Sequence, residues 1–192
     1  MKKIILLFTV LSIVLFSFKP VEPSTWVLDK SHSKLSFTIT HMMVTDCEGW
    51  FKKWDATLTS SKEDFSDATV EMTGDATSIN TEDEGRDKHI KGPDFLDVEK
   101  FNTLTFKSKL FKKVGDNAYK VTGDFTLHGI TKEIQLDVTC RTGTHPKTKK
   151  AIAGFKISGT FKRTDFGIAI PVSGAILSDE IAIIANTEFD KN

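Results

Sequence analysis

Residues 119–140 read YKVTGDFTLHGITKEIQLDVTC, and this stretch decides the fold. In each half, apolar residues occupy every second position, which is the pattern of a β-strand with one buried face. The segment between the halves, His128-Gly129-Ile130-Thr131-Lys132, is typical of a tight turn and predicts an antiparallel hairpin. The apolar residues of the expected buried face are Tyr119, Val121, Phe125 and Leu127, followed by Ile134, Leu136, Val138 and Cys140.

Six further runs show the same alternation, so we expect eight strands in all. In one of them Phe51 is out of phase with Trp50 and Trp54, which predicts a bulge near Lys52-Lys53. The apolar positions of the six runs are Leu35, Phe37, Ile39 and His41; Trp50, Trp54, Ala56 and Leu58; Ala68, Val70, Met72, Gly74 and Ala76; Leu104, Phe106 and Leu110; Ala153, Phe155, Ile157 and Phe161; and Ile181, Ile183 and Ala185.

Sequential antiparallel strands with one buried face must hide their free edges, and closure into a barrel removes those edges completely. Several of the runs reach about ten residues, whereas strands are usually about five or six residues long. This length favours an elongated barrel, with a β-sandwich of the same strands as the structural alternative. We therefore expect an all-β fold, an elongated antiparallel barrel of eight strands.

One stretch does not alternate, residues 86–101, RDKHIKGPDFLDVEKF. Its apolar residues fall closer to helical spacing, and Gly92-Pro93 interrupts them. Pro93 suits the first position of a helix, where its missing N–H would have no partner in any case. The pattern predicts a short helical insert near 86–98, made of two helical turns, that closes or steadies the barrel.

The N-terminus has the features of a secretory signal peptide, since Lys2 and Lys3 precede an apolar run from Ile4 to Phe18. The run is shorter than the ~20 residues that span a bilayer, although an uncleaved anchor remains the alternative. We expect a signal peptide at about 1–23, a barrel domain at 24–192, and a periplasmic or secreted protein.

Charge and motifs exclude several classes of protein. The full chain carries 26 basic and 26 acidic residues, and this lack of cationic excess makes nucleic acid an unsuitable partner. The five histidines show no metal-binding spacing, no nucleophile motif is present, and we expect neither a metal site nor an enzyme. Export would permit a disulfide between Cys47 and Cys140, but Cys140 continues an apolar strand face, which favours two free thiols.

The inward face of the expected barrel is almost free of hydroxyl and charged groups. Two structures fit this observation, a solidly packed core or a dry cavity that takes a hydrocarbon chain. The alternation of residues alone does not decide between them.

The chain carries an ordered set of motifs: Leu28-Asp29 with His32-Ser33; Phe37 and His41; Gly49 with Phe51; Ser78-Ile79; Arg86-Asp87 with His89; Asp94-Phe95-Leu96-Asp97-Val98; Gly123; Leu127-His128-Gly129 with Thr131-Lys132; Arg163 with Asp165-Phe166-Gly167-Ile168; and Ser178-Asp179-Glu180-Ile181. In this order and spacing the set resembles the YceI-like family of lipocalin-like, polyisoprenoid-binding proteins. The resemblance covers residues 26–188. It implies a lipocalin-like barrel that holds an isoprenoid or another long amphiphile, such as a quinone, polyprenyl lipid or fatty acyl chain, in an internal tunnel for sequestration or transport.

Given that resemblance, we expect the ligand to contact the inward-facing apolar side chains and no other cofactor to be required. The expected ligand-binding residues are Leu35, Phe37, Ile39, Val70, Met72, Leu104, Phe106, Phe125, Leu127, Phe155, Ile157, Phe161, Ile181 and Ile183. The expected polar mouth comprises Arg86, Asp87, His89, Asp97, Arg163 and Asp165.

The polar residues have two interpretations. They meet a ligand head group, or they fasten the insert and its neighbouring turn locally, with Arg86 paired to a carboxylate. An enzyme that uses His89 with Asp87 or Asp97, and a filled-barrel interaction module, are the alternative functions. The basic loop at 142–150 suggests transient contact with an anionic membrane, or simply a solvated hairpin tip. The sequence leaves the oligomeric state open, a homodimer included.

Overall fold

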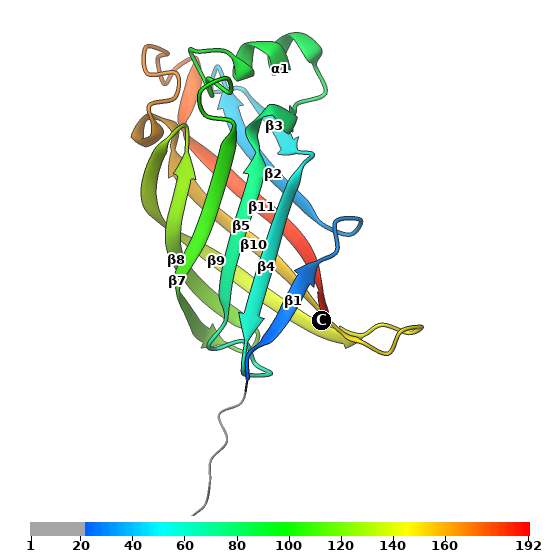
Figure 1. Ribbon diagram of the computed structural model, residues 1–192. Helices are drawn as coiled ribbons and strands as arrows, with labels where there is room; N and C mark the ends of the chain where they lie inside the picture. Colours follow the sequence, from blue (N-terminus) through cyan, green and yellow to red (C-terminus); the bar gives the residue numbers. More distant parts are fainter. Residues whose placement is uncertain (1–21) are drawn as a thin grey trace, which may run out of the picture.

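The first and last strands of the described residues, β1 (Ser24–Leu28) and β11 (Leu177–Lys191), pair with each other and so close the sheet into a barrel. The computed structural model describes residues 22–192, and Figure 1 shows an elongated barrel with one helix at one end. Six more strands complete the ring, in the order β4 (Trp54–Ser60), β5 (Thr69–Asp75), β7 (Thr103–Gly115), β8 (Ala118–Leu127), β9 (Ile130–Thr144) and β10 (Ala151–Lys162). All neighbours are antiparallel, and the prediction of a closed eight-stranded barrel is confirmed.

Three further strands continue the wall at the strand positions of β1, β4 and β5. They are β2 (Lys34–His41), β3 (Thr45–Phe51) and β6 (Ile79–Asn80), the last preceded by a 3-10 turn, η1 (Ala76–Ser78). β2 pairs with the first part of β11, β3 with β2, and β6 with β3. Each pair of segments therefore fills one strand position, and the eight alternating runs of the sequence correspond to the eight positions.

At two places along the wall, the side chains that the alternation predicts to face inward face outward instead. The expected break at Lys52-Lys53 separates β3 from β4, but it turns Phe51 rather than Trp50 toward the interior. Trp50 lies outside, where the Nζ of Lys34 is 4.1 Å from its ring centroid, so its predicted position was wrong.

A register shift in β7, between Ser108 and Leu110, has the same effect. Leu110 is 54% exposed, whereas Phe111 is buried, which corrects the prediction that Leu110 faces inward.

One end of the barrel is filled by an aromatic plug carried on the loop between β4 and β5. Phe65 in this loop is 1% exposed, and its ring centroid lies 5.2 Å from those of Trp26 and Phe155. The hydroxyl of Tyr119 donates a hydrogen bond to the carbonyl oxygen of Asp64, which ties the loop to β8. The structure therefore closes this end by packing. Ala68, at the end of the loop, was predicted to face inward and is buried, whereas Phe65 was not part of the predicted core.

The other end carries α1 (Glu84–Lys91), which lies across the barrel rim in Figure 1. Asp83 caps the helix, because its carboxylate accepts a hydrogen bond from the backbone N–H of Arg86. The helix ends at Gly92, and Pro93 is followed by turns rather than by a second helical turn, which corrects that part of the prediction. A second 3-10 turn, η2 (Arg163–Phe166), lies at the same end.

The expected signal peptide falls almost entirely on residues that lie outside the described part of the chain, so it stays a prediction. Among residues 22–192, no helix has the length and hydropathy needed to cross a membrane. Cys47 and Cys140 are both free thiols.

Candidate ligand-binding cavity

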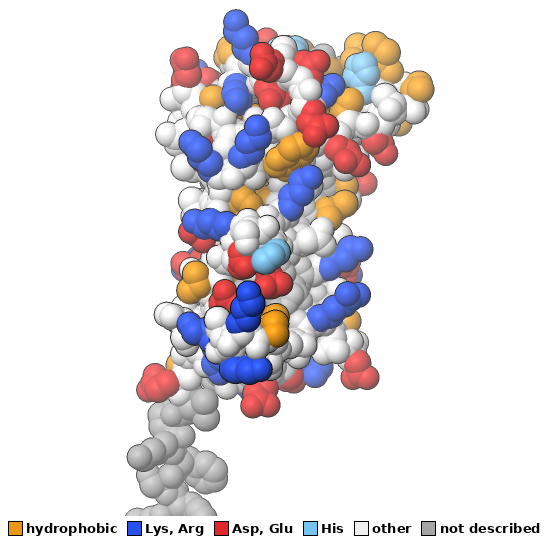
Figure 2. Space-filling model, turned by 90° about the vertical axis from the view of Figure 1, so that its right-hand side faces the viewer, with side chains coloured by type: hydrophobic (Ala, Val, Ile, Leu, Met, Phe, Trp, Pro, Cys, Tyr) orange, Lys and Arg blue, Asp and Glu red, His pale blue; other side chains and the backbone are white. Residues whose placement is uncertain are grey.

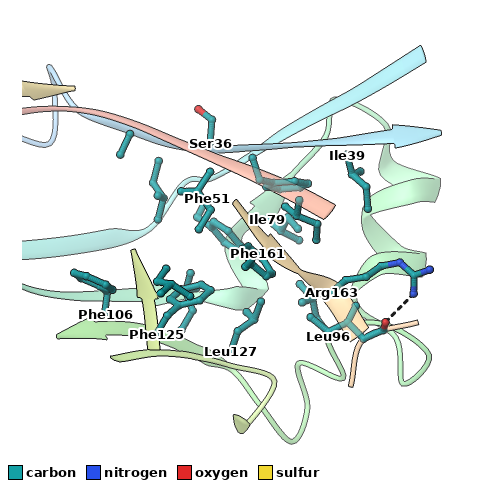
Figure 3. Close-up of a pocket in the computed structure, with 18 of the residues that line it drawn as sticks. Ser36, Ile39, Phe51, Ile79, Leu96, Phe106, Phe125, Leu127, Phe161 and Arg163 are labelled. Atoms are coloured by element: carbon teal, nitrogen blue, oxygen red, sulfur yellow. Dashed lines mark hydrogen bonds between the residues drawn. The ribbon is translucent and has the colours of Figure 1, made fainter. Parts of the chain in front are cut away.

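The barrel encloses a cavity of about 700 Å³, within the ~300–1,000 Å³ of typical ligand sites. Figure 3 shows side chains from several strands pointing into it. The interior of the barrel is therefore hollow where these side chains line it, and it is not packed solid. All of the apolar residues expected to face a ligand line this cavity: Leu35, Phe37, Ile39, Val70, Met72, Leu104, Phe106, Phe125, Leu127, Phe155, Ile157, Phe161, Ile181 and Ile183. Their contact with a ligand stays a prediction.

Inward-facing glycines leave room for aromatic rings along the wall. A Cβ atom on Gly49 would lie 2.4 Å from Cζ of Phe37, the residue paired with it on β2. A Cβ atom on Gly123 would lie 2.6 Å from Cζ of Phe106. Each ring therefore covers the backbone of a neighbouring strand, as strand glycines permit. Because the rings lie along the wall in this way, they leave the centre of the barrel free.

The cavity is also lined by residues outside the expected ligand-binding set. Phe51 and Phe111 enter it because the interruptions described above reverse the strand phase. The connection between η2 and β11 contributes Ile168, Val172 and Ile176, which lie outside any strand. Alternation identified the lining residues on the strands. The connection has no such pattern, but its length and its small apolar residues predict that segment 166–177 lines or gates the mouth, and its place in the lining is confirmed.

Arg86 and Asp87, two of the residues expected at the polar mouth, converge on Thr81. Asp87 accepts hydrogen bonds from the backbone N–H and the hydroxyl of Thr81, at 2.7 and 2.6 Å. Arg86 donates from Nε to the Thr81 hydroxyl and from Nη2 to the Thr81 carbonyl oxygen, at 2.9 and 2.6 Å. The expected ion pair between Arg86 and a carboxylate is replaced by these four hydrogen bonds, which fasten α1 to Thr81, the residue that follows β6. Arg86 lines the cavity as well, whereas Asp87 does not belong to its lining.

The remaining members of the α1 segment do not form a catalytic pair. His89 lines the cavity and packs edge-to-face on Phe95, with 4.8 Å between ring centroids. Asp97 lies outside the lining and is bound to the Nζ of Lys100 at 2.7 Å. Within residues 22–192, no hydrogen bond joins His89 to Asp87 or Asp97, so the geometry gives the acid–base hypothesis no support.

Arg163 is the one charged side chain of the mouth that is fully buried within the described chain, at 2% exposure. Its guanidinium donates to the carbonyl oxygens of Ser178, Ile168, Ala169, Val172 and Leu177, at 2.5 to 3.3 Å. It lies at the cavity end beside α1, where Figure 3 marks one of these bonds. Arg163 therefore holds the whole connection between η2 and β11 against the barrel rim.

The neighbours of Arg163 complete this fastening. Asp179 accepts hydrogen bonds from the hydroxyl and the backbone N–H of Thr164, and these bonds lower the pKa of its carboxyl group. Asp165, the last residue of the expected polar mouth, is exposed and does not line the cavity.

Cys140 and Tyr119, two buried titratable groups at the plugged end of the barrel, are neutral. Burial raises the pKa of the Cys140 thiol to about 11, and burial likewise raises the pKa of Tyr119. The lining of the cavity is mostly apolar. Most of its polar side chains lie at the α1 end, chiefly Thr81, Arg86, His89 and Asp94, while Ser36 and Thr187 line it elsewhere.

Two further groups of polar residues lie away from the cavity. The basic loop at 142–150, between β9 and β10, is at the end opposite α1 in Figure 1. On the outer wall, among the described residues, metal-ligating atoms converge at Asp29, His32 and Glu188. The Nδ1 of His32 lies 2.8 Å from Asp29 Oδ2, and hydrogen bonds from Ser31 and then from His32 hold the pKa of Asp29 at about 2.

A family model described as the YceI-like domain matches residues 26–189, nearly the whole described barrel. The chain belongs to the YceI-like family. A UPF0312 protein of Staphylococcus aureus is 33% identical to this YceI-like protein over 171 residues, which cover 86% of this chain and 97% of the relative.

Solved structures share the barrel of this YceI-like protein. The Campylobacter jejuni YceI protein is 31% identical, with a TM-score of 0.73, over 86% of this chain and 96% of that one. BcnA of Burkholderia cenocepacia is 24% identical, with a TM-score of 0.74, over 84% of this chain and 98% of that one. A domain from Saccharophagus degradans, described as polyisoprenoid-binding, is 16% identical, with a TM-score of 0.64, over 87% and 98%. At these identities the last two show the common fold.

Proposed function

We propose that this protein binds an isoprenoid or another long-chain amphiphile, such as a quinone, polyprenyl lipid or fatty acyl chain, inside the barrel. It acts as an exported carrier, periplasmic or secreted, that sequesters or transports its ligand and performs no chemistry on it. The observation that carries the proposal is the cavity of about 700 Å³, whose lining is mostly apolar and whose polar side chains gather mainly at one end. The description of the Saccharophagus degradans domain as polyisoprenoid-binding gives further support.

Burial of an alkyl chain supplies enough free energy for such a role. Each buried CH₂ group contributes about 0.8 kcal/mol, so one five-carbon isoprene unit contributes roughly 3–4 kcal/mol before the cost of ordering the chain. Two or three buried units would therefore give useful affinity without a polar contact. The length and width of the cavity would then set selectivity for the tail.

The head group of the ligand would lie at the α1 end. Thr81 and Arg86 already satisfy much of each other's hydrogen-bonding capacity, and all five bonds of Arg163 go to backbone carbonyl oxygens. The rim therefore offers few strong donors to a ligand. This arrangement favours a weakly polar head group, such as a hydroxyl or a quinone ring, over a multiply charged one.

The experiment is organic extraction of the purified protein, followed by mass spectrometry of the extract and titration with an added isoprenoid quinone. We expect a stoichiometric lipid, or uptake of the quinone by protein that was emptied first. No lipid and no uptake would refute the proposal.

A matched pair of variants locates the bound ligand. Ala185 lines the cavity, whereas the adjacent Ile184 is 37% exposed on the outer face. Ala185→Phe should fill the bore and lower uptake at least tenfold, and Ile184→Phe should leave uptake unchanged. Equal uptake by folded forms of both variants would place the ligand outside the barrel.

A further inference from the structure

The rim beside the cavity carries exposed apolar side chains that the proposed ligand site does not explain. Met42, Met43 and Val44 form the turn between β2 and β3 and are 57%, 63% and 86% exposed. Ile170 and Ile176, on the connection between η2 and β11, are 55% and 50% exposed. These five residues are called the mouth patch. In Figure 2 hydrophobic side chains project at the upper right, at the end of the barrel that carries α1.

The mouth patch is continuous with the cavity. The backbone N–H of Met42 donates a hydrogen bond of 2.7 Å to the carbonyl oxygen of Ile176, and His41 pairs with Leu177, so the two segments form one surface. Ile176 is half exposed and also lines the cavity, together with Pro171 and Val172. An alkyl chain that leaves the cavity here would pass directly onto apolar surface.

The backbone of the turn is strained to present its methionines. Met42 and Met43 have φ angles of 49° and 55°, in the left-handed region that most side chains avoid. A turn with positive φ at both central residues normally uses Asn-Gly there, which is unstrained and hydrophilic. The chain instead places two flexible, apolar side chains there in contact with solvent. Strain that persists at an exposed site is a sign of function rather than of stability.

The absence of charged residues in the mouth patch indicates which kind of lipid surface it suits. Residues 40–45 and 168–178 contain no Lys, Arg, Asp or Glu, and the residues that follow them, Asp46 and Asp179, are acidic. An apolar surface with an acidic border suits a zwitterionic lipid surface and disfavours an anionic one. Apolar side chains that project from a rim bind such a surface by entering the boundary between head groups and acyl chains.

We propose that the mouth patch docks onto the surface of a zwitterionic lipid bilayer, so that the ligand moves between bilayer and cavity without crossing water. The proposal rests on the function proposed above, because it names the route by which the lipid enters. It assigns membrane contact to the α1 end of the barrel and not to the basic loop at 142–150.

The test compares the wild-type protein with a double variant, Met42→Asn and Met43→Gly, which suits the left-handed turn and removes the apolar side chains. The matched control is Leu110→Ser with Val114→Ser, because these two are 54% and 53% exposed on β7, away from the mouth patch. Co-flotation with phosphatidylcholine vesicles measures docking. A second assay follows uptake of a fluorescent isoprenoid alcohol, either from the vesicles or from a dilute ethanol stock.

We expect the mouth variant to lose at least tenfold in vesicle binding and in the rate of uptake from vesicles. Its uptake from ethanol should equal that of the wild type, and the control should match the wild type throughout. Equal vesicle binding by all three proteins, or stronger binding when phosphatidylglycerol is added, would overturn the proposal. So would a mouth variant that changes only the oligomeric mass measured by light scattering. Vesicle docking through the patch without isoprenoid uptake from either source would refute the proposed function and leave the docking surface standing.

Discussion

Phe65→Ala should destabilise the protein and lengthen its cavity at the same time. Phe65 is 1% exposed and packs on Phe155, which lines the cavity. Loss of a buried phenylalanine ring costs about 3–5 kcal/mol in the free energy of unfolding. An engineered cavity of about 150 Å³ holds a benzene molecule, so the removed ring vacates roughly the room that one five-carbon isoprene unit needs. A tail longer by one unit would regain up to about 3–4 kcal/mol on entering this space.

Two assays measure the two effects in the same variant. Urea unfolding gives the loss of stability, and competition among isoprenoid alcohols that differ by one unit gives the preferred length. We expect Phe65→Ala to favour an alcohol one unit longer than the wild type favours. Val27→Ala is the control, because Val27 is 47% exposed on the outside of β1 and should change neither property. If Phe65→Ala folds, loses stability as expected and yet keeps the wild-type length preference, the plug does not set the depth of the cavity.

Three other perturbations have definite expected outcomes. Arg163→Met leaves the five carbonyl oxygens without their donor, so the free energy of unfolding should fall by about 3 kcal/mol or more. Backbone amides of residues 167–178 should then exchange their hydrogens fast. Slow exchange in these residues would contradict the anchoring role of Arg163. Gly123→Ala would place a Cβ atom 2.5 Å from a carbonyl oxygen of the neighbouring strand. Thermal unfolding should therefore show that the free energy of unfolding falls by about 1–3 kcal/mol. An unchanged melting temperature would argue against this close packing. The pKa of Asp29, about 2, lies below its usual value, so its stabilising contribution is complete above about pH 4 and is lost as the pH falls toward 2. Asp29→Asn should therefore flatten the acid limb of the stability profile, and an equally steep limb would exclude Asp29 as its source.

The inward faces of most strands could be predicted because alternation is a local property of the sequence. Phe125 and Phe155 face the cavity as their runs indicate. The hairpin predicted at residues 128–132 is present, but its turn is limited to His128 and Gly129, which both have positive φ angles, because Ile130 already belongs to β9. The closure of the ring through β1 and β11 joins the two ends of the chain, and it was inferred from the need to hide free edges.

What the sequence did not reveal depends on contacts between distant residues. Phe65 lies in a loop, and its burial becomes evident only when the ends of several strands surround it. The partners of Arg163 are backbone carbonyl oxygens, which no residue type identifies. The phase of Phe51 and Phe111 depends on interruptions whose exact position alternation does not specify. The polar mouth was therefore predicted as a set of residues, while the bond that each one makes was not.

The central claim is that the hollow interior of the barrel holds an alkyl chain. Isotope-filtered NOE spectroscopy tests it directly, with ¹³C-labelled protein and an unlabelled isoprenoid such as geranylgeraniol. The account predicts cross-peaks from the methyl groups of the ligand to the ring protons of Phe37, Phe106, Phe125 and Phe155, which all line the cavity. Cross-peaks confined to outward-facing residues such as Trp50 and Ile184, or saturable binding with no cross-peak to the four rings, would contradict it.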